Sequence, residues 1–482
     1  MASQLIDERR VSALNDADPH PNADFVLYAM EASQRAQDNH ALEHAVRCAN
    51  DLGKPVVVAF PLFGDAFGAG RRQKRFMLEG LRDVSAGLAR RNIRFVMTLG
   101  EMAEQTLKLA DRAALVVLDR GYLRHQRDYA DRIADDCPVR VEQVETNVVV
   151  PVDEASEKRE HAARTIRPRI LRKLDDFLVE LRTTPLEKAS LDLKFAADVS
   201  NRLEDIDGLL DELDLPDNEA GLSPLFTGGE HTAKRRFGAF LEDGFQQYSA
   251  HRNQPQTSDC SYMSMYLHYG QVSPIWLVQT VRDAGAGGED DRKDFEEELV
   301  IRRELAMNFC AFSDDYDRYS ALPNFARITL DDHRGDEREH LYTPAEFEDA
   351  RTHDPYWNAA MRELRYTGYM HNYMRMYWGK KVLEWSASPE QAFETLVKLN
   401  DRYFLDGRDP NSYTGVSWCF GTHDRGWTER PVYGKVRYMN ANGLKRKCDP
   451  DAYVAKVDAL VQDVGGPQPD PDSSREAGSL FG

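Results

Sequence analysis

The sequence predicts an α/β domain followed by a larger all-helical domain. Five short runs rich in β-branched residues alternate with helical segments between residues 23 and 155, and from 229 to 462 the apolar residues recur mostly at helical spacing. Regular alternation of strand and helix is typical of a parallel sheet with helices on both faces. A chain of 482 residues is also too long for a single core, so two or three domains are expected.

The α/β domain is assigned to residues 23–155, after an N-terminal extension formed by residues 1–22. Its expected strands are the runs bounded by turn residues at 24–30, 55–63, 93–100, 114–119 and 139–145. Helices are expected over 38–51 and 74–92, where the apolar residues follow a helical period. The sequence contains no glycine-rich dinucleotide motif and no P-loop, so spacing alone leaves open whether this domain binds a ligand or only packs.

Residues 156–228 are interpreted as an interdomain connector. They begin with a helical segment, KREHAARTIRPRI, and end with an acidic stretch, NRLEDIDGLLDELDLPDNEAGLSP. The helical domain is assigned to residues 229–462. The Pro-, Gly- and Asp-rich residues 463–482 are expected to form a disordered tail.

The composition limits the partners and the compartment. A formal charge of −19 should repel nucleic acid unless basic residues gather locally. No apolar run is long enough for a membrane span, and the start of the chain lacks a signal-peptide core. The six cysteines are scattered without a CxxC pair, which argues against disulfides and against a zinc or iron–sulfur site, so no metal is predicted. A reducing cytoplasm is the expected location.

One helical stretch, MHNYMRMYWGKKVLEW at residues 370–385, concentrates easily oxidised side chains around polar groups. Trp378 and Trp385 are seven residues apart, so they share a face with about 10 Å of rise between them. Aligned tryptophans can pass an oxidising hole through a protein, although a plain core stripe is the commoner meaning of this spacing. Arg375 and Asn372 favour a site, because a buried arginine needs a partner. Candidate acceptors for Arg375 follow nearby, namely Asn400, Asp406 and Asp409.

A second segment is strongly basic. Residues 425–447 hold seven Arg or Lys residues and one acidic residue, Glu429, which gives a local net charge of +6. Trp427, Tyr433 and Tyr438 are interleaved with the charges. Basic residues neutralise phosphates and aromatic faces stack on exposed bases, so this pattern favours nucleic-acid binding over a merely solvated face.

A third segment, FEEELVIRRELAMNF at residues 295–309, places a carboxylate beside an arginine on an apolar helix. Glu298, Arg302 and Leu305 are predicted to share one helical face. Spacing alone does not decide between a buried ion pair and a functional site.

These segments closely resemble the characteristic stretches of class II cyclobutane-pyrimidine-dimer photolyases. The similarity extends from about residue 23 to 455, and it includes SQRAQDNHAL near the start and REHAARTIRPRI at the domain junction. The resemblance implies an antenna domain at 23–155 and a helical FAD-binding catalytic domain at 229–462. It also implies that FAD is bound in a bent form, and that its reduced, photoexcited form lends an electron to a pyrimidine dimer while the cyclobutane ring opens.

The resemblance also implies roles for residues around the flavin. Asn400 would face flavin N5, and Arg375 and Asp406 would form a salt bridge beside the isoalloxazine, near Asn372. The segment that wraps the flavin phosphates corresponds to Tyr248, Ser261 and Ser264. A tryptophan relay for photoreduction of the flavin would run from Trp378 through Trp357 and Trp385 to the surface.

For the substrate, the resemblance implies a dimer flipped out of the duplex into a pocket. Glu298 would hydrogen-bond the dimer and stabilise the charge that develops on it. The other implied contacts to the lesion and the DNA are Met376, Trp418, Arg425, Trp427 and Arg437. The chain departs from the family pattern at Met265, Met307 and Tyr433, and its loop before His423 is one residue shorter than usual.

Two other functions remain to be weighed against light-driven repair. A cryptochrome-like blue-light receptor shares the fold and the flavin, but it needs neither Glu298, Trp418 and Trp427 nor the basic segment. A flavin-free single-strand-binding module would leave Arg375, Asp406 and the tryptophan relay unexplained. The expected partner is UV-damaged DNA, and the protein is expected to be a monomer without an obligate protein partner. The sequence does not decide whether an antenna pigment such as 8-hydroxy-5-deazaflavin is bound.

Overall fold

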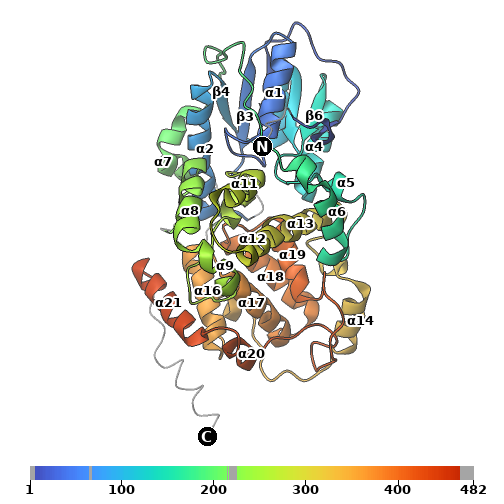
Figure 1. Ribbon diagram of the computed structural model, residues 1–482, viewed down its shortest axis with the longest axis vertical. Helices are drawn as coiled ribbons and strands as arrows, with labels where there is room; N and C mark the ends of the chain where they lie inside the picture. Colours follow the sequence, from blue (N-terminus) through green and yellow to red (C-terminus); the bar gives the residue numbers. More distant parts are fainter. Residues whose placement is uncertain (1–5, 65–67, 214, 217–224, 467–482) are drawn as a thin grey trace.

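The computed structural model describes residues 6–64, 68–213, 215–216 and 225–466, and it places an α/β part above a helical part (Figure 1). The α/β part contains a six-stranded sheet in the order β1-β6-β5-β2-β3-β4, in which β1 is antiparallel to β6 and the other neighbours are parallel. The strands are β1 Val11–Ala13, β2 Phe25–Ala29, β3 Val56–Leu62, β4 Arg94–Leu99, β5 Ala113–Asp119 and β6 Val141–Val144. The predicted fold class is therefore confirmed for this part.

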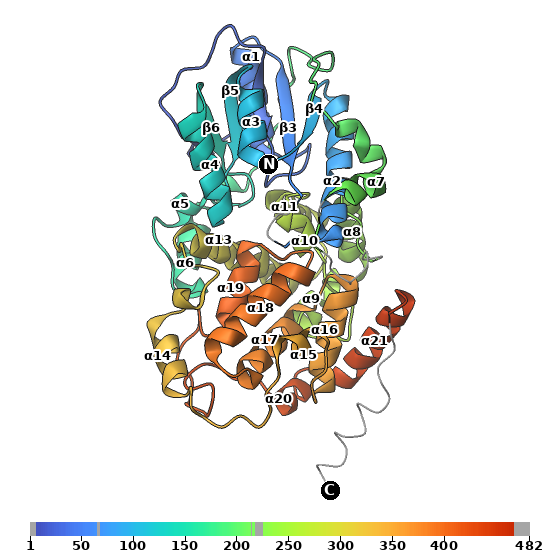
Figure 2. The ribbon, with the colours of Figure 1, turned by 180° about the vertical axis from the view of Figure 1, so that it is seen from behind.

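Helices cover both faces of the sheet, as predicted. The helices α1 His40–Asp51 and α2 Arg71–Arg90 pack on one face, and α3 Met102–Ala110 and α4 Arg124–Asp136 pack on the other (Figures 1 and 2). The strands β2, β3 and β5 are buried along their whole length. Burial on both faces explains why their sequences read as continuous apolar runs that are easy to recognise.

The strand β1 was not predicted, and it lies in the stretch assigned to an N-terminal extension. It pairs Val11 with Val144 of β6 and follows a short 3₁₀ turn, Glu8–Arg10. Three residues, two of them exposed, carry too little periodicity to predict a strand, so the pairing with β6 defines this one. The sheet therefore includes residues before the predicted domain start at residue 23.

The predicted connector, residues 156–228, is more than a linker. After α5 Val152–Ala155 it contains α6 Ala163–Phe177, a 3₁₀ turn Ser200–Glu204 and α7 Ile206–Glu212. Between these, the chain returns to the sheet, where the amide of Ser190 donates to the carbonyl of Asn92 at 3.0 Å and the amide of Val199 to that of Met97 at 2.7 Å. The end of the predicted acidic stretch, residues 217–224, lies outside the described residues.

The second part is helical, and its described residues 225–466 contain no strand, only one isolated bridge between Arg430 and Gly434. Its helices are α8 Glu230–Asp243, α9 Tyr248–His251, α10 Ser264–His268, α11 Pro274–Ala284, α12 Glu289–Glu296, α13 Arg303–Ala311, α14 Asn324–Asp332, α15 Pro344–Glu348, α16 Pro355–Thr367, α17 Asn372–Trp385, α18 Pro389–Tyr403, α19 Pro410–Cys419, α20 Ala441–Lys445 and α21 Pro450–Asp463. Short 3₁₀ turns at Phe245–Gln247 and Tyr319–Ala321 and a π-helical segment at Glu297–Arg302 complete it. The helical domain is thus confirmed, whereas most of the predicted tail, residues 467–482, lies outside the described residues.

The two parts share one continuous hydrophobic core and touch closely. Apolar residues of the sheet, of α8 and of α11 belong to the same buried cluster. At Gly270, with a positive φ of 64°, an added Cβ would lie 2.0 Å from the carbonyl oxygen of Ala32, so only glycine permits this backbone approach. Among the described residues, no helix is both long and apolar enough to cross a membrane.

Candidate functional site

Arg375 and Asp406 form an ion pair between α17 and the turn that links α18 to α19. Nη2 of Arg375 lies 3.1 Å from Oδ1 and 3.0 Å from Oδ2 of Asp406, and its Nε donates to the carbonyl of Met370 at 2.9 Å. The guanidinium carbon lies 4.0 Å from the ring centroid of Phe404. Of the three acceptors considered from the sequence, Asp406 is therefore the partner of Arg375.

Asn400 lies near the end of α18 and is buried. Its Nδ2 donates to Oδ1 of Asp401 at 2.9 Å, and the hydroxyl of Tyr413 donates to Oδ2 of the same carboxylate at 3.1 Å. Burial raises the pKa of Asp401 above its ordinary value. The neighbouring carboxyl group therefore fixes the orientation of the Asn400 amide, as a residue that contacts a cofactor needs.

Three tryptophans lie in series beside this pair. The ring of Trp378 is 6.2 Å from that of Phe404, and Nε1 of Trp357 donates to the carbonyl of Trp378 at 3.0 Å. The ring of Trp357 is in turn 6.3 Å from that of Trp385. Beyond Trp385 come the rings of the exposed His353 at 4.8 Å and of Tyr342 at 5.8 Å. The structure thus brings the three predicted residues together, with Trp357 bridging the two tryptophans of α17.

The residues expected at the flavin phosphates lie around the short helices α9 and α10. Tyr248 starts α9 and packs on Phe240 and Phe295 at ring distances of 5.9 and 5.6 Å. Ser261 is half-buried, and its Oγ accepts from the amide of Met263 at 3.4 Å. Ser264 begins α10 and Asn372 begins α17, and both are exposed, with no side-chain hydrogen bond to another described residue. These polar groups remain available to a ligand.

Glu298 lies in the π-helical segment between α12 and α13. Its carboxylate forms an ion pair with Arg252, which also lies 3.3 Å from Asp294. Arg302 pairs with Glu297 instead, at 3.0 Å. The wider π turn changes the register, so the interpretation of Glu298 and Arg302 as a possible pair on one face is wrong. Such π segments occur often at functional sites.

Trp418 is half-buried at the end of α19, where it meets residues from two other segments. The guanidinium carbon of Arg302 lies 5.2 Å from its ring centroid, and the ring of His423 lies 6.1 Å away. Met376 is half-buried on α17 and packs against the core of the helical part. Two departures from the family pattern, Met265 and Met307, are fully packed in hydrophobic cores and leave these contacts unaffected.

The basic segment presents one aromatic ring to solvent. Trp427 is 40% exposed, and the guanidinium carbons of Arg425 and Arg437 lie 5.3 and 5.1 Å from its ring centroid. Its Nε1 donates to the carboxylate of Asp424 at 3.2 Å. Tyr433 is buried, and its hydroxyl donates to the carbonyl of Lys380 at 2.9 Å. Tyr433 therefore cannot stack on a base, and of the three aromatics noted in this segment Trp427 is the exposed one.

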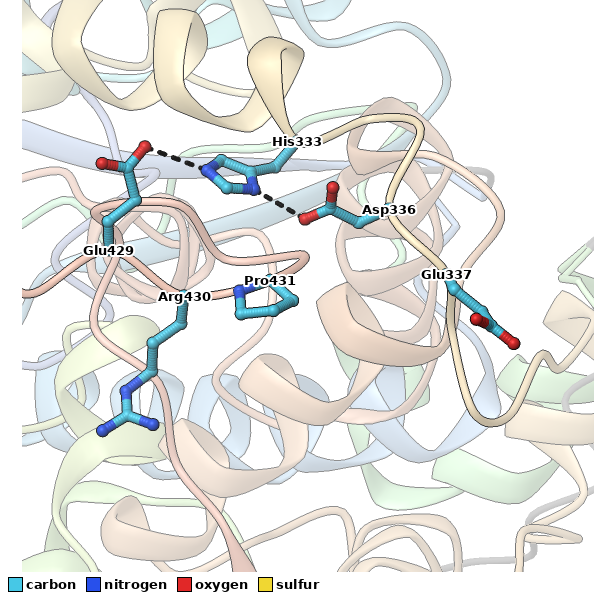
Figure 3. Close-up of a pocket in the computed structure, with 6 residues that line it drawn as sticks. All are labelled: His333, Asp336, Glu337, Glu429, Arg430 and Pro431. Carbon is cyan, nitrogen blue, oxygen red and sulfur yellow. Dashed lines mark hydrogen bonds and ion pairs between the residues drawn. The ribbon is translucent and has the colours of Figure 1, made fainter.

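A histidine clasp, formed by His333, Asp336 and Glu429, holds the basic segment against α14. Nδ1 of His333 lies 2.6 Å from Asp336, and its Nε2 lies 3.0 Å from Glu429 (Figure 3). The clasp borders an open hollow of about 530 Å³ that is also lined by Arg430 and Pro431. The hydrogen bonds with Glu429 and Asp336 raise the pKa of His333.

The sequence did not reveal either Arg252 or His333 as part of the site. Arg252 is 46 residues from Glu298, and His333 is 96 residues from Glu429. Neither residue belongs to a spaced motif, so no local signal identifies its partner. The sequence offered one hint, its overall acidity. In a chain with more carboxylates than cations, an arginine or histidine outside any motif is expected to find a carboxylate partner.

Elsewhere, one cluster of potential metal ligands occurs among the described residues. Ligand atoms of His44, Cys48 and Glu142 lie within 4.8 Å of one another. Arg47 contacts Nδ1 of His44 at 3.1 Å and Arg140 contacts Glu142 at 3.0 Å. Arg140 thus balances the carboxylate of Glu142 and Arg47 occupies the second ring nitrogen of His44, so the cluster is a hydrogen-bonded network.

The polar groups around α17 and α19 fit a large polar cofactor. Buried atoms with no hydrogen-bond partner in the described part of the chain include Nε1 of Trp378 and the hydroxyls of Thr414, Ser417 and Thr422. Native proteins rarely leave such groups unpaired, and a bound ligand is one standard explanation. Trp378 packs on Phe404, which Arg375 also contacts, so Nε1 of Trp378 lies near the Arg375–Asp406 pair and could donate to a cofactor with many acceptors.

Comparison with known families agrees with a cofactor site in the helical part. Residues 26–188 match the family model described as DNA photolyase, and residues 295–458 match the one described as FAD binding domain of DNA photolyase. The fold and the site thus define an FAD-binding protein built from an α/β domain and a helical cofactor domain.

Relatives that match nearly the whole chain indicate which FAD-binding family it belongs to. The deoxyribodipyrimidine photo-lyase of Methanothermobacter thermautotrophicus is 45% identical, and the match covers 95% of this chain and 100% of the relative. The deoxyribodipyrimidine photo-lyase of Oryza sativa is 40% identical, and the match covers 90% of this chain and 88% of the relative. The chain belongs to the DNA photolyase family, which confirms the resemblance noted from the sequence.

Solved structures support the fold alone. The cryptochrome of Synechocystis superposes with a TM-score of 0.70 at 14% sequence identity, covering 95% of this chain and 99% of that one. Because a receptor and a repair enzyme can share this architecture, the fold does not separate their functions.

Proposed function

We propose that this protein repairs cyclobutane pyrimidine dimers in DNA with the energy of absorbed light. The names of its relatives at 35–45% identity support repair over the receptor alternative. Reduced FAD, when bound and excited by light, supplies the electron that opens the cyclobutane ring. The observation that carries the proposal is the Arg375–Asp406 pair with the tryptophan series beside it. Further along the chain, the exposed Trp427 lies near Arg425 and Arg437.

The residues near the cofactor are proposed to bind and orient it. Arg375 and Asp406 would lie beside the isoalloxazine, where a paired charge can hold the ring without leaving an uncompensated ion. The amide of Asn400, fixed by Asp401, would face N5, and Asn372 would lie at the edge of the site. The hydroxyls of Ser261 and Ser264 and the ring of Tyr248 would surround the phosphates.

Repair requires FAD in its reduced form, and the tryptophans are proposed to supply the electrons that reduce it. A hole would pass from Trp378 to Trp357 and then to Trp385, next to the exposed His353. This pathway would serve activation of the enzyme rather than each repair turnover.

The DNA-facing residues are proposed to receive the flipped lesion. Glu298 would hydrogen-bond the dimer and stabilise developing charge, while Met376 and Trp418 would line the pocket. Trp427 would line the pocket with them, and Arg425 and Arg437, which lie near its ring, would enter or flank the gap left in the duplex. Flipping a dimer costs less than flipping intact bases, because the lesion already pairs and stacks poorly.

The test is repair by the purified, reduced protein under blue light. Duplex DNA that contains a thymine dimer should regain intact thymines, measured by chromatography, and a dark sample should not. Bound reduced FAD without repair in the light would move the protein to the receptor class. A preparation that lacks flavin absorbance would contradict both assignments.

We also propose that the protein is a cytoplasmic monomer without an obligate protein partner, with domains divided as predicted except that β1 joins the α/β domain. Its six cysteines are all free, which suits a reducing compartment. The large exposed hydrophobic side chains of the described residues come from separate segments, namely Phe63, Leu99, Leu171, Leu191, Ile328, Leu341 and Trp427. A deazaflavin antenna in the α/β domain remains part of this proposal, and a second chromophore band in the absorption spectrum would test it.

A further inference from the structure

A second basic surface lies on α6, in the REHAARTIRPRI stretch to which the roles above assign no function. Residues 158–173 hold seven Arg or Lys residues and one acidic residue, Glu160, a local net charge of +6, and exposed carboxylates flank this window at Glu157, Asp175 and Asp176. The whole chain carries −19, with 81 acidic against 62 basic residues. A concentration of positive charge on such a chain needs a reason.

The helix turns its apolar side inward and some of its cations to solvent. Its buried residues recur at helical spacing and are Ala163, Ile166, Ile170, Leu174 and Phe177. Lys158, Arg164 and Arg172 are exposed. No described carboxylate lies within ion-pair distance of these three side chains, in contrast to Arg167, which pairs with Glu297 at 2.6 Å.

The start of this surface is held rigidly. Asn308 of α13 is fully buried, accepts from the amide of Glu160 at 2.7 Å and donates to the carbonyl of Lys158 at 3.0 Å. The carboxylate of Glu160 is itself buried and accepts from the hydroxyl of Ser156 at 2.8 Å. The carboxylate of Glu160 is therefore withdrawn from the surface. The two carboxylates of α6 itself, Asp175 and Asp176, are exposed in its last turn, where Asp176 lies 3.6 Å from Arg9, so the cationic face covers the earlier turns of the helix.

This face adjoins the proposed lesion pocket. Glu297, which pairs with Arg167 of α6, also pairs with Arg302, and Arg302 lies over Trp418. The carbonyl of His161 contacts Nδ1 of His423 at 3.0 Å. Both views of the molecule show α6 beside α13 (Figures 1 and 2).

We propose that the exposed cations Lys158, Arg164 and Arg172 bind phosphates of the DNA duplex that flanks the lesion, an inference that rests on the proposed function. Arg164 and Arg172 are eight residues apart, or about 12 Å along the helix axis. A DNA strand rises about 3.4 Å per phosphate, so this span corresponds to roughly three or four phosphates. Phosphate contacts position a duplex without reading its sequence or its damage.

The chain offers a matched control for this proposal. Arg82 and Arg90 of α2 are also eight residues apart and exposed, and no described carboxylate lies within ion-pair distance of either. Both views place α2 on the opposite side of the molecule from α6 (Figures 1 and 2). The double variants Arg164→Gln/Arg172→Gln and Arg82→Gln/Arg90→Gln remove the same charge from the two helices.

The experiment measures the Kd of the full-length protein for a duplex with and without one dimer, over a series of salt concentrations. For the α6 variant we expect a weaker Kd for both duplexes by the same factor. The slope of log K against log salt should fall by about 2, because each lost phosphate contact contributes about 0.9. The α2 variant should keep the wild-type Kd and slope.

Two results would overturn the inference. Unchanged affinity and slope in the α6 variant would show that its cations do not meet DNA, and would leave an acidic protein as the partner to seek. A loss restricted to the damaged duplex would mean that the substitutions disturb the pocket instead. Repair of dimers by the wild type in the light is recorded in parallel, and its absence would instead count against the proposed function.

Discussion

Trp378 is the residue at which the proposed cofactor site meets the tryptophan series. Its ring is 3% exposed, and its Nε1 has no partner among the described residues. The backbone carbonyl of Trp378 accepts from Nε1 of Trp357, so the first two members of the series are joined by a hydrogen bond. A buried indole with this placement is suited to be the first donor to a cofactor beside Arg375.

Replacement of Trp378 by phenylalanine should sharply slow photoreduction of bound FAD, because phenylalanine is much harder to oxidise than tryptophan. The measurement is the loss of oxidised-flavin absorbance under blue light with an external reductant. Trp276→Phe is the control, since Trp276 packs on Phe237 in the other core and has no contact with the series. Equal photoreduction in Trp378→Phe and wild type would remove Trp378 from the relay.

At the scale of elements, the turn that carries Trp427 depends on α14 for its position. Asp336 of the histidine clasp also accepts from the amide of Val432 at 2.8 Å, and the hydroxyl of Thr329 accepts from the amide of Lys435 at 3.0 Å. An added Cβ on Gly434 would lie 2.1 Å from that hydroxyl, so the turn is pressed against the helix. The clasp therefore ties the proposed DNA-gap residues to a fixed element.

Breaking the clasp with His333→Ala should weaken binding to dimer-containing duplex several-fold, because the turn loses its tie through Glu429, and because Asp336, which accepts from the amide of Val432, loses the histidine that orients it. The histidine contributes most when it is protonated between Asp336 and Glu429, with Glu337, Arg430 and Lys435 as the other charges nearby. The pKa of His333 is raised in the folded protein. Its contribution to holding the turn is therefore complete below about pH 6.5, and it is lost as the pH rises through the raised pKa.

The measurement is the Kd for damaged duplex between pH 6 and pH 9, with the ordinary histidine pKa near 6.5 as the reference point. Wild-type affinity should fall over this range more steeply than that of His333→Ala. Parallel curves for the two proteins would exclude the clasp as a pH-dependent tie.

Elements that are buried on both faces were predictable from the sequence, whereas those defined by a distant partner were not. The strands β2, β3 and β5 appear as apolar runs, and α17 attracted attention through its composition. The strand β1 has three residues, and the π segment at Glu297–Arg302 has the same local sequence pattern as an α-helix. The Arg375–Asp406 pair could be foreseen because an arginine expected in a core demands a carboxylate and the family resemblance named it, although the structure leaves Arg375 only half-buried. No such demand pointed to His333 and Glu429, which are partly exposed.

At the scale of the whole molecule, the two domains are joined through the segment 145–150. Arg35 donates to the carbonyls of Thr146 and Gly270, and Arg303 donates to that of Asn147. The buried carboxyl of Glu304 accepts from the amide of Val149 at 2.6 Å, and burial raises its pKa to about 8. The backbone carbonyls of this segment lie outside helices and strands, so buried arginine side chains serve as their hydrogen-bond donors.

Arg10 extends this junction from a stretch that the sequence assigned to an N-terminal extension. It is 3% exposed and donates to the carbonyls of Glu145, Val148 and Val149. Arg10→Met keeps much of the side-chain volume but leaves three buried carbonyls without a donor. We expect a loss of stability on the order of 3 kcal/mol, because each unsatisfied buried group costs about 1–3 kcal/mol and some will find water.

Urea unfolding followed by circular dichroism measures this loss, and Arg9→Met is the matched control one residue away. Arg9 is half-exposed and pairs with Asp7 at the surface, so its replacement should cost at most about 1 kcal/mol. Because β1 and Arg10 hold the sheet edge and the domain junction at once, the Arg10 variant should also release bound FAD at lower urea than Arg9→Met. Equal midpoints for the two variants would show that the first residues are dispensable for the junction, as an extension would be.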